Sequence, residues 1–196
     1  MLDLGDDPAV RGYQQLIDTY RDARQWEPAS SVADEAVKRF PKDRSLLISQ
    51  AGLYADTGKG AKASEILTSL LLPGDDRENR EIQIALAQVN SRLRNWHEAE
   101  EAAGAAERLS RSPEERQYTA FLQGSIYERQ KKFEQAEERF RAVLKNDPEN
   151  AATLNYLGYM LADRGVRLDE ALAMIKKAVE MEPQNGAYLD SLGWAY

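Results

Sequence analysis

The chain has 196 residues and no cysteine, which excludes disulfides, thiolate metal sites and cysteine nucleophiles. Its formal net charge of -7 disfavours nucleic-acid binding, which needs clustered lysine and arginine. Hydrophobic residues make up 42% and charged residues 30%, a composition typical of a folded domain rather than a disordered chain. No apolar run approaches the roughly 18 residues that a membrane-spanning helix needs.

Five segments share one pattern along the chain: an apolar or small residue, an alanine three positions later, and an apolar or small residue four positions after that. They are residues 26–41, 60–74, 96–109, 133–150 and 168–185. Their central alanines are Ala29, Ala63, Ala99, Ala136 and Ala171. Consecutive alanines are therefore 34, 36, 37 and 35 residues apart. A period of this length predicts a repeat protein in which each repeat is one small structural unit.

A second helix pattern precedes each of these segments. It lies at residues 13–20, 47–54, 83–90, 120–127 and 154–161, where four positions separated by steps of three, one and three form the stripe of one helix face. In the third of these, Gln83 and Asn90 stand at positions that are usually apolar. Small residues such as Gly158 and Ala171 allow the two helices of a pair to lie close together and antiparallel. The sequence therefore predicts an all-α fold of helix pairs joined by short turns.

Local signals mark several of the expected boundaries. The stretch "SPEE", residues 112–115, is a helix start with Ser112 as N-cap and Glu115 three residues later. The stretch "TGKGAKAS", residues 57–64, lacks the first glycine of a phosphate-binding loop and is interpreted as a glycine turn between two helices. Between the second and third repeats, "LLPGDDREN" adds a turn, and "RGVRLDE" places one extra residue between the helices of the fifth repeat.

Taken together, the period and the order of leucine, glycine, tyrosine, alanine and proline resemble the tetratricopeptide repeat. The resemblance runs from about Val10 to Tyr196. It implies an α-solenoid, a right-handed superhelix of about five helix-turn-helix repeats plus a lone C-terminal helix, in a single domain. The implied repeats are residues 10–43, 44–79, 80–116, 117–150 and 151–185, with a partial sixth at 186–196.

No constellation of residues in the sequence indicates catalysis. The single histidine, His97, is expected to be an exposed helix residue, and the acidic clusters "HEAEE" and "EQAEE" are expected to be solvated helix surface. We therefore expect no catalytic residues, no cofactor and no metal site.

The resemblance implies that the second, fifth, ninth and twelfth positions of each repeat face a concave groove. At the fifth and ninth positions of the first repeat, Gln14 and Asp18 replace the lysine and asparagine of the clamp that holds acidic C-terminal tails, so this recognition is disfavoured. In the later repeats the groove positions are aromatic and polar. The candidate partner-binding residues are Tyr118, Phe121, Ser125, Asn155, Tyr159, Asp190 and Trp194.

The sequence thus favours a non-enzymatic scaffold that binds a peptide or protein in its groove. Two alternatives stay open: a module that mediates homo-oligomerisation through the uncapped helix at residues 186–196, and the regulatory part of a larger enzyme. The ending "AYLDSLGWAY" reads as the first half of a repeat, so a piece of a longer chain is expected. Similarity to bacterial tetratricopeptide proteins, many of them attached to the cell envelope, favours an envelope or periplasmic location over a cytoplasmic one.

Overall fold

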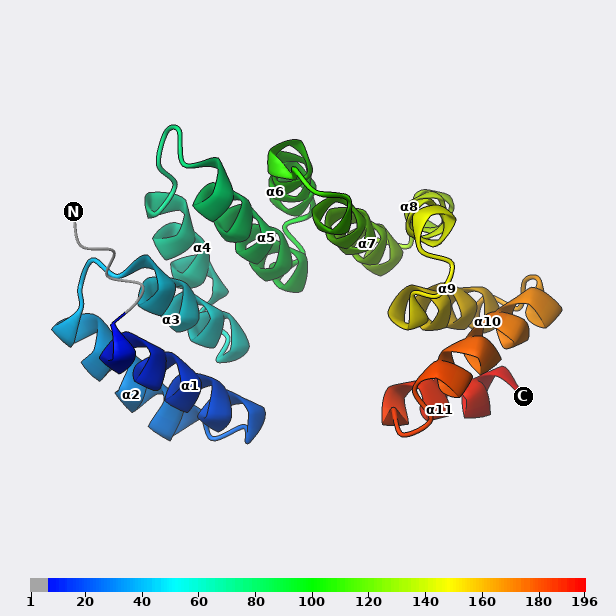
Figure 1. The fold of residues 1–196 in the computed structure, drawn as a ribbon, viewed down its shortest axis with the longest axis horizontal. Helices are drawn as coiled ribbons and strands as arrows, with labels where there is room; N and C mark the ends of the chain where they lie inside the picture. Colours follow the sequence, from blue (N-terminus) through cyan, green and yellow to red (C-terminus); the bar gives the residue numbers. More distant parts are fainter. Residues whose placement is uncertain (1–6) are drawn as a thin grey trace. The chain divides into compact units, whose positions relative to one another are not determined.

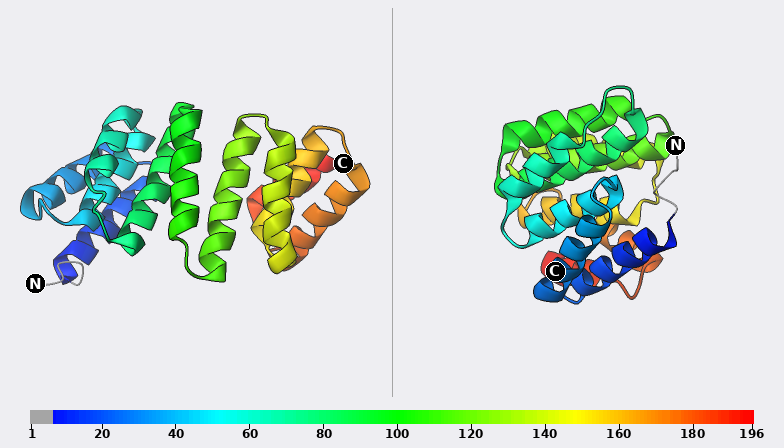
Figure 2. Two further views of the ribbon diagram at one scale, coloured as in Figure 1. Left: turned by 90° about the horizontal axis from the view of Figure 1, so that it is seen from above. Right: turned by 90° about the vertical axis from the view of Figure 1, so that its left-hand side faces the viewer.

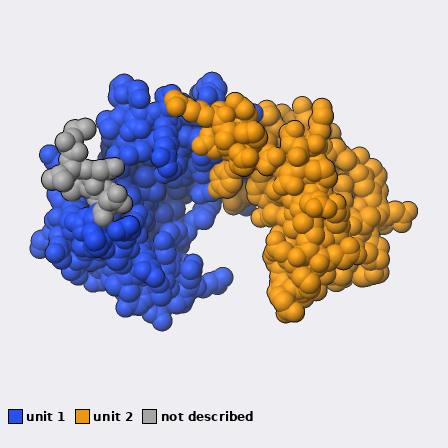
Figure 3. Space-filling model, viewed as in Figure 1, with its two compact units in different colours: residues 1–109 blue, residues 110–196 orange. Residues whose placement is uncertain are grey.

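The computed structural model describes residues 7–196, and within this range the chain forms eleven α-helices and no strand. It divides into two compact units, unit 1 up to Leu109 and unit 2 from Ser110 to Tyr196 (Figure 3). Each unit is an all-α solenoid of antiparallel helix pairs, as the repeat pattern predicts.

Unit 1 contains three helix pairs (Figure 1). Their bounds are α1 Pro8–Asp22 and α2 Trp26–Arg39, α3 Arg44–Asp56 and α4 Gly60–Ser69, and α5 Asp76–Leu93 and α6 Trp96–Leu109. The first helix of each pair is called a first helix below, and the other is called a second helix. The first helices pack in series, α1 on α3 and α3 on α5, while α2 and α4 each pack against the first helix of the next pair. The first helices therefore form one continuous layer of unit 1.

Unit 2 contains two further pairs and a final helix. Their bounds are α7 Pro113–Arg129 and α8 Phe133–Asn146, α9 Ala151–Asp163 and α10 Leu168–Met181, and α11 Gly186–Ala195. The helices of each pair lie side by side (Figure 2), and α11 packs against both α10 and α9. The pairing of α11 with α9 repeats the contact between first helices in unit 1.

The first helix of each pair, and α11, begins with a side chain that caps its N-terminus. These caps explain why the six helices start at these residues. The capping residues are Asp7, Asp43, Asp75, Ser112, Asn150 and Asn185. The Ser112 hydroxyl accepts a hydrogen bond from the Glu115 amide at 3.1 Å, and the Glu115 carboxylate accepts one from the Ser112 amide at 3.2 Å. The capping box predicted from "SPEE" is thus confirmed.

Each turn between the two helices of a pair contains at least one residue with a positive φ, in the left-handed region of the Ramachandran plot. Such residues are Arg24, Gly58, Arg94, Lys131 and, in the last turn, both Gly165 and Arg167. Gly58, with φ 80°, confirms the glycine turn predicted in "TGKGAKAS". The last turn, residues 164–167, is one residue longer than the turn at 130–132 and contains the extra residue predicted there.

The core lies between the two helices of each pair. All five periodic alanines, from Ala29 to Ala171, are fully buried, as the close-approach pattern predicts. Larger residues such as Phe140 and Leu157 surround the small ones and are also fully buried. All seven candidate residues lie on the helices α7, α9 and α11, and they differ in how far they are exposed.

Candidate partner-binding surfaces

Three of the predicted binding residues are exposed aromatic side chains on the first helices of unit 2. Tyr118 on α7 is 46% exposed, Tyr159 on α9 is 39% exposed and Trp194 on α11 is 65% exposed. Large rings left in water are unusual unless another surface covers them, because they bury more apolar area than other side chains when they are covered. These three rings are called the aromatic face below.

Phe121 contributes to packing as well as to this region. Its ring is half-buried and lies 5.6 Å from the Phe140 ring and 5.0 Å from the Tyr156 ring, the latter edge-on. Tyr156, which the sequence analysis did not select, is itself exposed beside Phe121. The sequence signal that could have indicated Tyr156 is its position directly after the candidate residue Asn155 in "LNYLGYML". Phe121 therefore supports the contact between α7, α8 and α9 and presents only part of its ring.

The predicted polar residues differ in how they are used. The Ser125 hydroxyl donates to the Phe121 carbonyl at 3.1 Å, so it is engaged inside α7. Asn155 is only 7% exposed, and its buried Oδ1 accepts no hydrogen bond within residues 7–196. Asp190 lies exposed on α11. Asn155 and Tyr159 are one turn apart on α9, so the Asn155 amide lies on the same face of the helix as the exposed Tyr159 ring.

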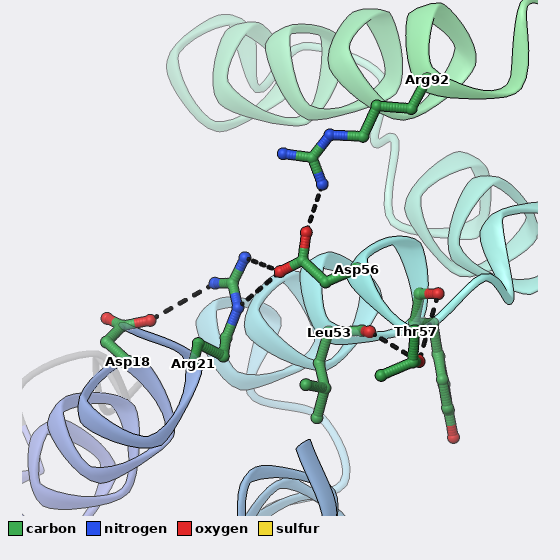
Figure 4. Close-up of polar contacts among 7 residues, drawn as sticks. Asp18, Arg21, Leu53, Asp56, Thr57 and Arg92 are labelled. Atoms are coloured by element: carbon green, nitrogen blue, oxygen red, sulfur yellow. Dashed lines mark hydrogen bonds and ion pairs between the residues drawn. The ribbon is translucent and has the colours of Figure 1, made fainter. Parts of the chain in front are cut away.

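Unit 1 holds a second surface, built around an ion network that joins all three first helices (Figure 4). Arg21 of α1 donates to Asp56 Oδ2 of α3 from Nε at 3.0 Å and from Nη2 at 2.6 Å. Arg92 of α5 donates to the other oxygen of the same carboxylate through Nη1. Asp18 approaches Arg21 Nη1 at 3.5 Å from the exposed side. One largely buried carboxylate thus holds two guanidinium groups together.

A cavity of about 200 Å³ opens beside this network. Arg21 and Arg92 line it together with Ile48, Ala55 and Gly52. A Cβ atom on Gly52 would lie 3.3 Å from Nη2 of Arg21, so the missing side chain leaves the guanidinium room to lie against α3. This unit 1 cavity is called the arginine cavity below.

A larger, polar cavity of about 620 Å³ lies among α4, α5 and α6. Gln83 and Asn90, the polar residues at usually apolar repeat positions, both line it. The side-chain Oδ1 of Asn90 accepts hydrogen bonds from the Ser64 hydroxyl at 3.1 Å and from the side-chain Nδ2 of Asn95 at 3.4 Å. The irregular third repeat thus has a physical cause, because its polar positions face a polar space instead of a core.

His97 is exposed on α6, as predicted, with Nε2 3.7 Å from a carboxylate oxygen of Glu101. Nowhere in residues 7–196 do three or more histidine, aspartate or glutamate side chains gather so that they could hold a metal ion. Among the same residues, no helix combines the length and the apolar character needed to cross a membrane.

Comparison with known proteins identifies a repeat within unit 2 and shows the fold of the chain. Residues 121–186 match a family model described as tetratricopeptide repeat. The solved structure of TTC0263, a thermophilic TPR protein of Thermus thermophilus, is similar with a TM-score of 0.78 and 19% identity, covering 95% of this chain and 98% of that one. PilF of Pseudomonas aeruginosa gives 0.70 and 19%, covering 97% and 90%.

A third similar structure is YrrB, described as a TPR protein with an unusual peptide-binding site. Its TM-score is 0.57 and its identity 21%, covering 91% of this chain and 89% of that one. No curated protein sequence gives a significant match. At these levels of identity the similar structures establish the fold alone.

Proposed function

We propose that this tetratricopeptide-repeat protein is a non-enzymatic scaffold that binds a peptide or protein partner on the free faces of its first helices. The observation that carries the proposal is the aromatic face, formed by Tyr118, Tyr159 and Trp194. Aromatic side chains are enriched in the cores of protein interfaces, where they bury large areas at low entropic cost. The peptide-binding site described for YrrB, which shares the fold, is consistent with a peptide as partner here.

The test replaces exposed rings and leaves the packing intact. A random 12-residue peptide library displayed on phage is selected on the whole 196-residue protein, and the best peptides are measured by fluorescence anisotropy. The double variant Tyr159→Ala and Trp194→Ala should weaken binding at least about tenfold, because hot-spot aromatics contribute about 2 kcal/mol or more. Phe121 is not replaced, since its ring packs against Phe140 and Tyr156.

The matched control is Leu168→Ala, which removes an exposed apolar side chain from a second helix of the same unit. It should change affinity less than about twofold, because exposed residues outside an interface contribute little to binding. Circular dichroism should show unchanged helicity in every variant. An unaltered affinity of the double variant would remove the aromatic face from the binding surface.

Self-association is a second candidate function, favoured by the exposed residues Leu189, Trp194 and Tyr196 at α11. Apolar surface at one end of a helix stack can be covered by another copy of the same chain. Light scattering should then show dimers at high protein concentration, and Leu189→Ser should shift them to monomers. A monomer at every concentration would contradict this candidate and leave peptide binding unaffected.

A further inference from the structure

We propose that the arginine cavity of unit 1 binds the acidic side chain of a peptide partner, with Arg92 and Arg21 as the groups that hold its carboxylate. The inference rests on the proposed function and adds to it a specificity for glutamate or aspartate at one position of the peptide. It concerns a side-chain carboxylate between α1, α3 and α5, whereas the missing clamp would hold a C-terminal carboxylate through other repeat positions.

The first argument is local charge. Two guanidinium groups meet one carboxylate, that of Asp56, so this group of three carries one net positive charge in a chain whose formal net charge is -7. Asp18 offsets the excess only weakly, because its side chain is 60% exposed and its oxygen is 3.5 Å from Arg21. With Asp18 the formal charges of the network sum to zero, but Asp18 is mostly in solvent, so a carboxylate that enters the cavity meets two guanidinium groups that share one closely held carboxylate.

The second argument is the supply of hydrogen-bond donors. Arg92 uses only Nη1 for a hydrogen bond within the described residues, although a guanidinium carries five N–H groups. Its side chain is 49% exposed, so the other N–H groups are open to solvent and to a ligand. The planar fork of arginine matches two carboxylate oxygens at once, which makes such a pair both stronger and more directional than a single contact.

The third argument is that the site is held in position before a ligand arrives. Two hydrogen bonds to Asp56 fix the Arg21 guanidinium, and the absence of a side chain at Gly52 lets it lie against α3. The same carboxylate fixes one nitrogen of Arg92. A group that is already ordered loses little conformational entropy on binding, so more of the interaction energy appears as affinity.

The fourth argument is the shape and lining of the cavity. Its volume is about 200 Å³, and apolar groups of Ile48, Ala55 and Val89 line it beside the two arginines. Methylene groups of an acidic side chain can contact these residues while the carboxylate reaches the guanidinium groups. A longer glutamate side chain offers more of this apolar contact than aspartate, so glutamate is the expected preference.

The experiment uses peptides selected on the intact protein from the random 12-residue library. We expect the enriched sequences to share one glutamate or aspartate flanked by apolar residues. The best peptide is then compared with its Glu→Gln version on the wild-type protein and on the Arg92→Gln variant. Each single change should weaken binding about tenfold, and both together should weaken it little more than one, because they remove the same contact.

The control is Arg77→Gln, which removes an exposed arginine at the opposite end of α5 and should change affinity less than about twofold. Enriched peptides without an acidic residue, or full additivity of the two changes, would overturn the inference.

Failure of this inference can be separated from failure of the proposed function. Peptides that lose affinity with the Tyr159→Ala and Trp194→Ala variant but not with Arg92→Gln would overturn the acidic subsite and support the scaffold. A library that yields no binding peptide at all would count against both.

Discussion

A Cβ atom placed on Gly158 would lie only 2.9 Å from the carbonyl oxygen of Ala171, which belongs to the partner helix α10. It would also lie 2.8 Å from Cγ1 of Ile175. Both distances are shorter than normal contacts, and a backbone oxygen cannot move without the whole helix. We expect Gly158→Ala to lower the free energy of unfolding by about 2 kcal/mol, as overpacking in a core typically does. Urea unfolding followed by circular dichroism measures this.

Gly193 provides the matched control, because it occupies the corresponding position of α11 and a Cβ atom placed on it would have no neighbour within 4 Å. Alanine is favoured over glycine in a helix by up to about 1 kcal/mol. Gly193→Ala should therefore leave stability unchanged or raise it. A similar loss of stability in both variants would show that helix approach is not the reason for glycine at this repeat position.

This helix approach was predictable from sequence because it depends on local spacing. A small residue in the first helix and another in the second, as in Gly158 and Ala171, recur along the chain. In each repeat this pattern indicates that the two helices approach closely. Caps and turns are local in the same way, and so the "SPEE" start at Ser112 and the turn at Gly58 are confirmed. Spacing also places Tyr159 on the free face of its helix, where the structure finds it exposed.

Contacts between distant residues were not predictable from spacing. The repeat position of Phe121 indicated the groove, but how much of its ring is covered depends on Tyr156 in the next pair. In unit 1 the twelfth position of the third repeat, expected to face the groove, is Ser91, which is buried, whereas the next residue, Arg92, lines the arginine cavity. Arg92 and Asp56 are 36 residues apart and come into contact because consecutive helix pairs pack on one another. The pattern of a single helix does not predict such a contact.

A pH dependence is expected at Glu137, a carboxylate of α8 that two arginines contact. Burial alone would raise the pKa of the Glu137 carboxyl, but hydrogen bonds from Arg167 and Arg141 outweigh it and lower the pKa below its usual 4.5. A lowered pKa in the folded state gives stability that is present above pH 4.5 and is lost as the pH falls through the lower value.

Glu137→Gln should consequently be less stable than the wild-type protein at pH 7, by about 1 kcal/mol, since solvent screens the half-exposed arginines. The difference should shrink as the pH falls through the lowered pKa of Glu137, because the wild-type carboxylate then becomes protonated as well. Thermal unfolding between pH 3 and 7 measures it. Glu134→Gln, which changes an 87% exposed carboxylate on the same helix, serves as the control and should show almost no difference at any pH.

The Arg44 side chain, at the start of α3, contacts the six-residue link between α4 and α5, residues 70–75. Its Nη2 donates to the Leu70 carbonyl at 2.8 Å, its Nη1 lies 2.7 Å from Asp75, and it also pairs with Glu78. Since only 18% of the Arg44 side chain is exposed, its removal takes a part-buried donor from the Leu70 carbonyl and the cation from the Asp75 carboxylate, which keeps its capping bond to the Glu78 amide. We expect Arg44→Met to lower the free energy of unfolding by about 1–2 kcal/mol.

The loss should be local before it is global, because the link at residues 70–75 has no helix of its own. Hydrogen exchange measured by mass spectrometry should show faster exchange for peptides that cover residues 70–79 in Arg44→Met, with unit 2 unchanged. Lys42→Met, at a nearby exposed position, is the matched control and should exchange like the wild-type protein. Unchanged protection of residues 70–79 in Arg44→Met would mean that the link is held by its Asn79 contacts with Leu72 alone.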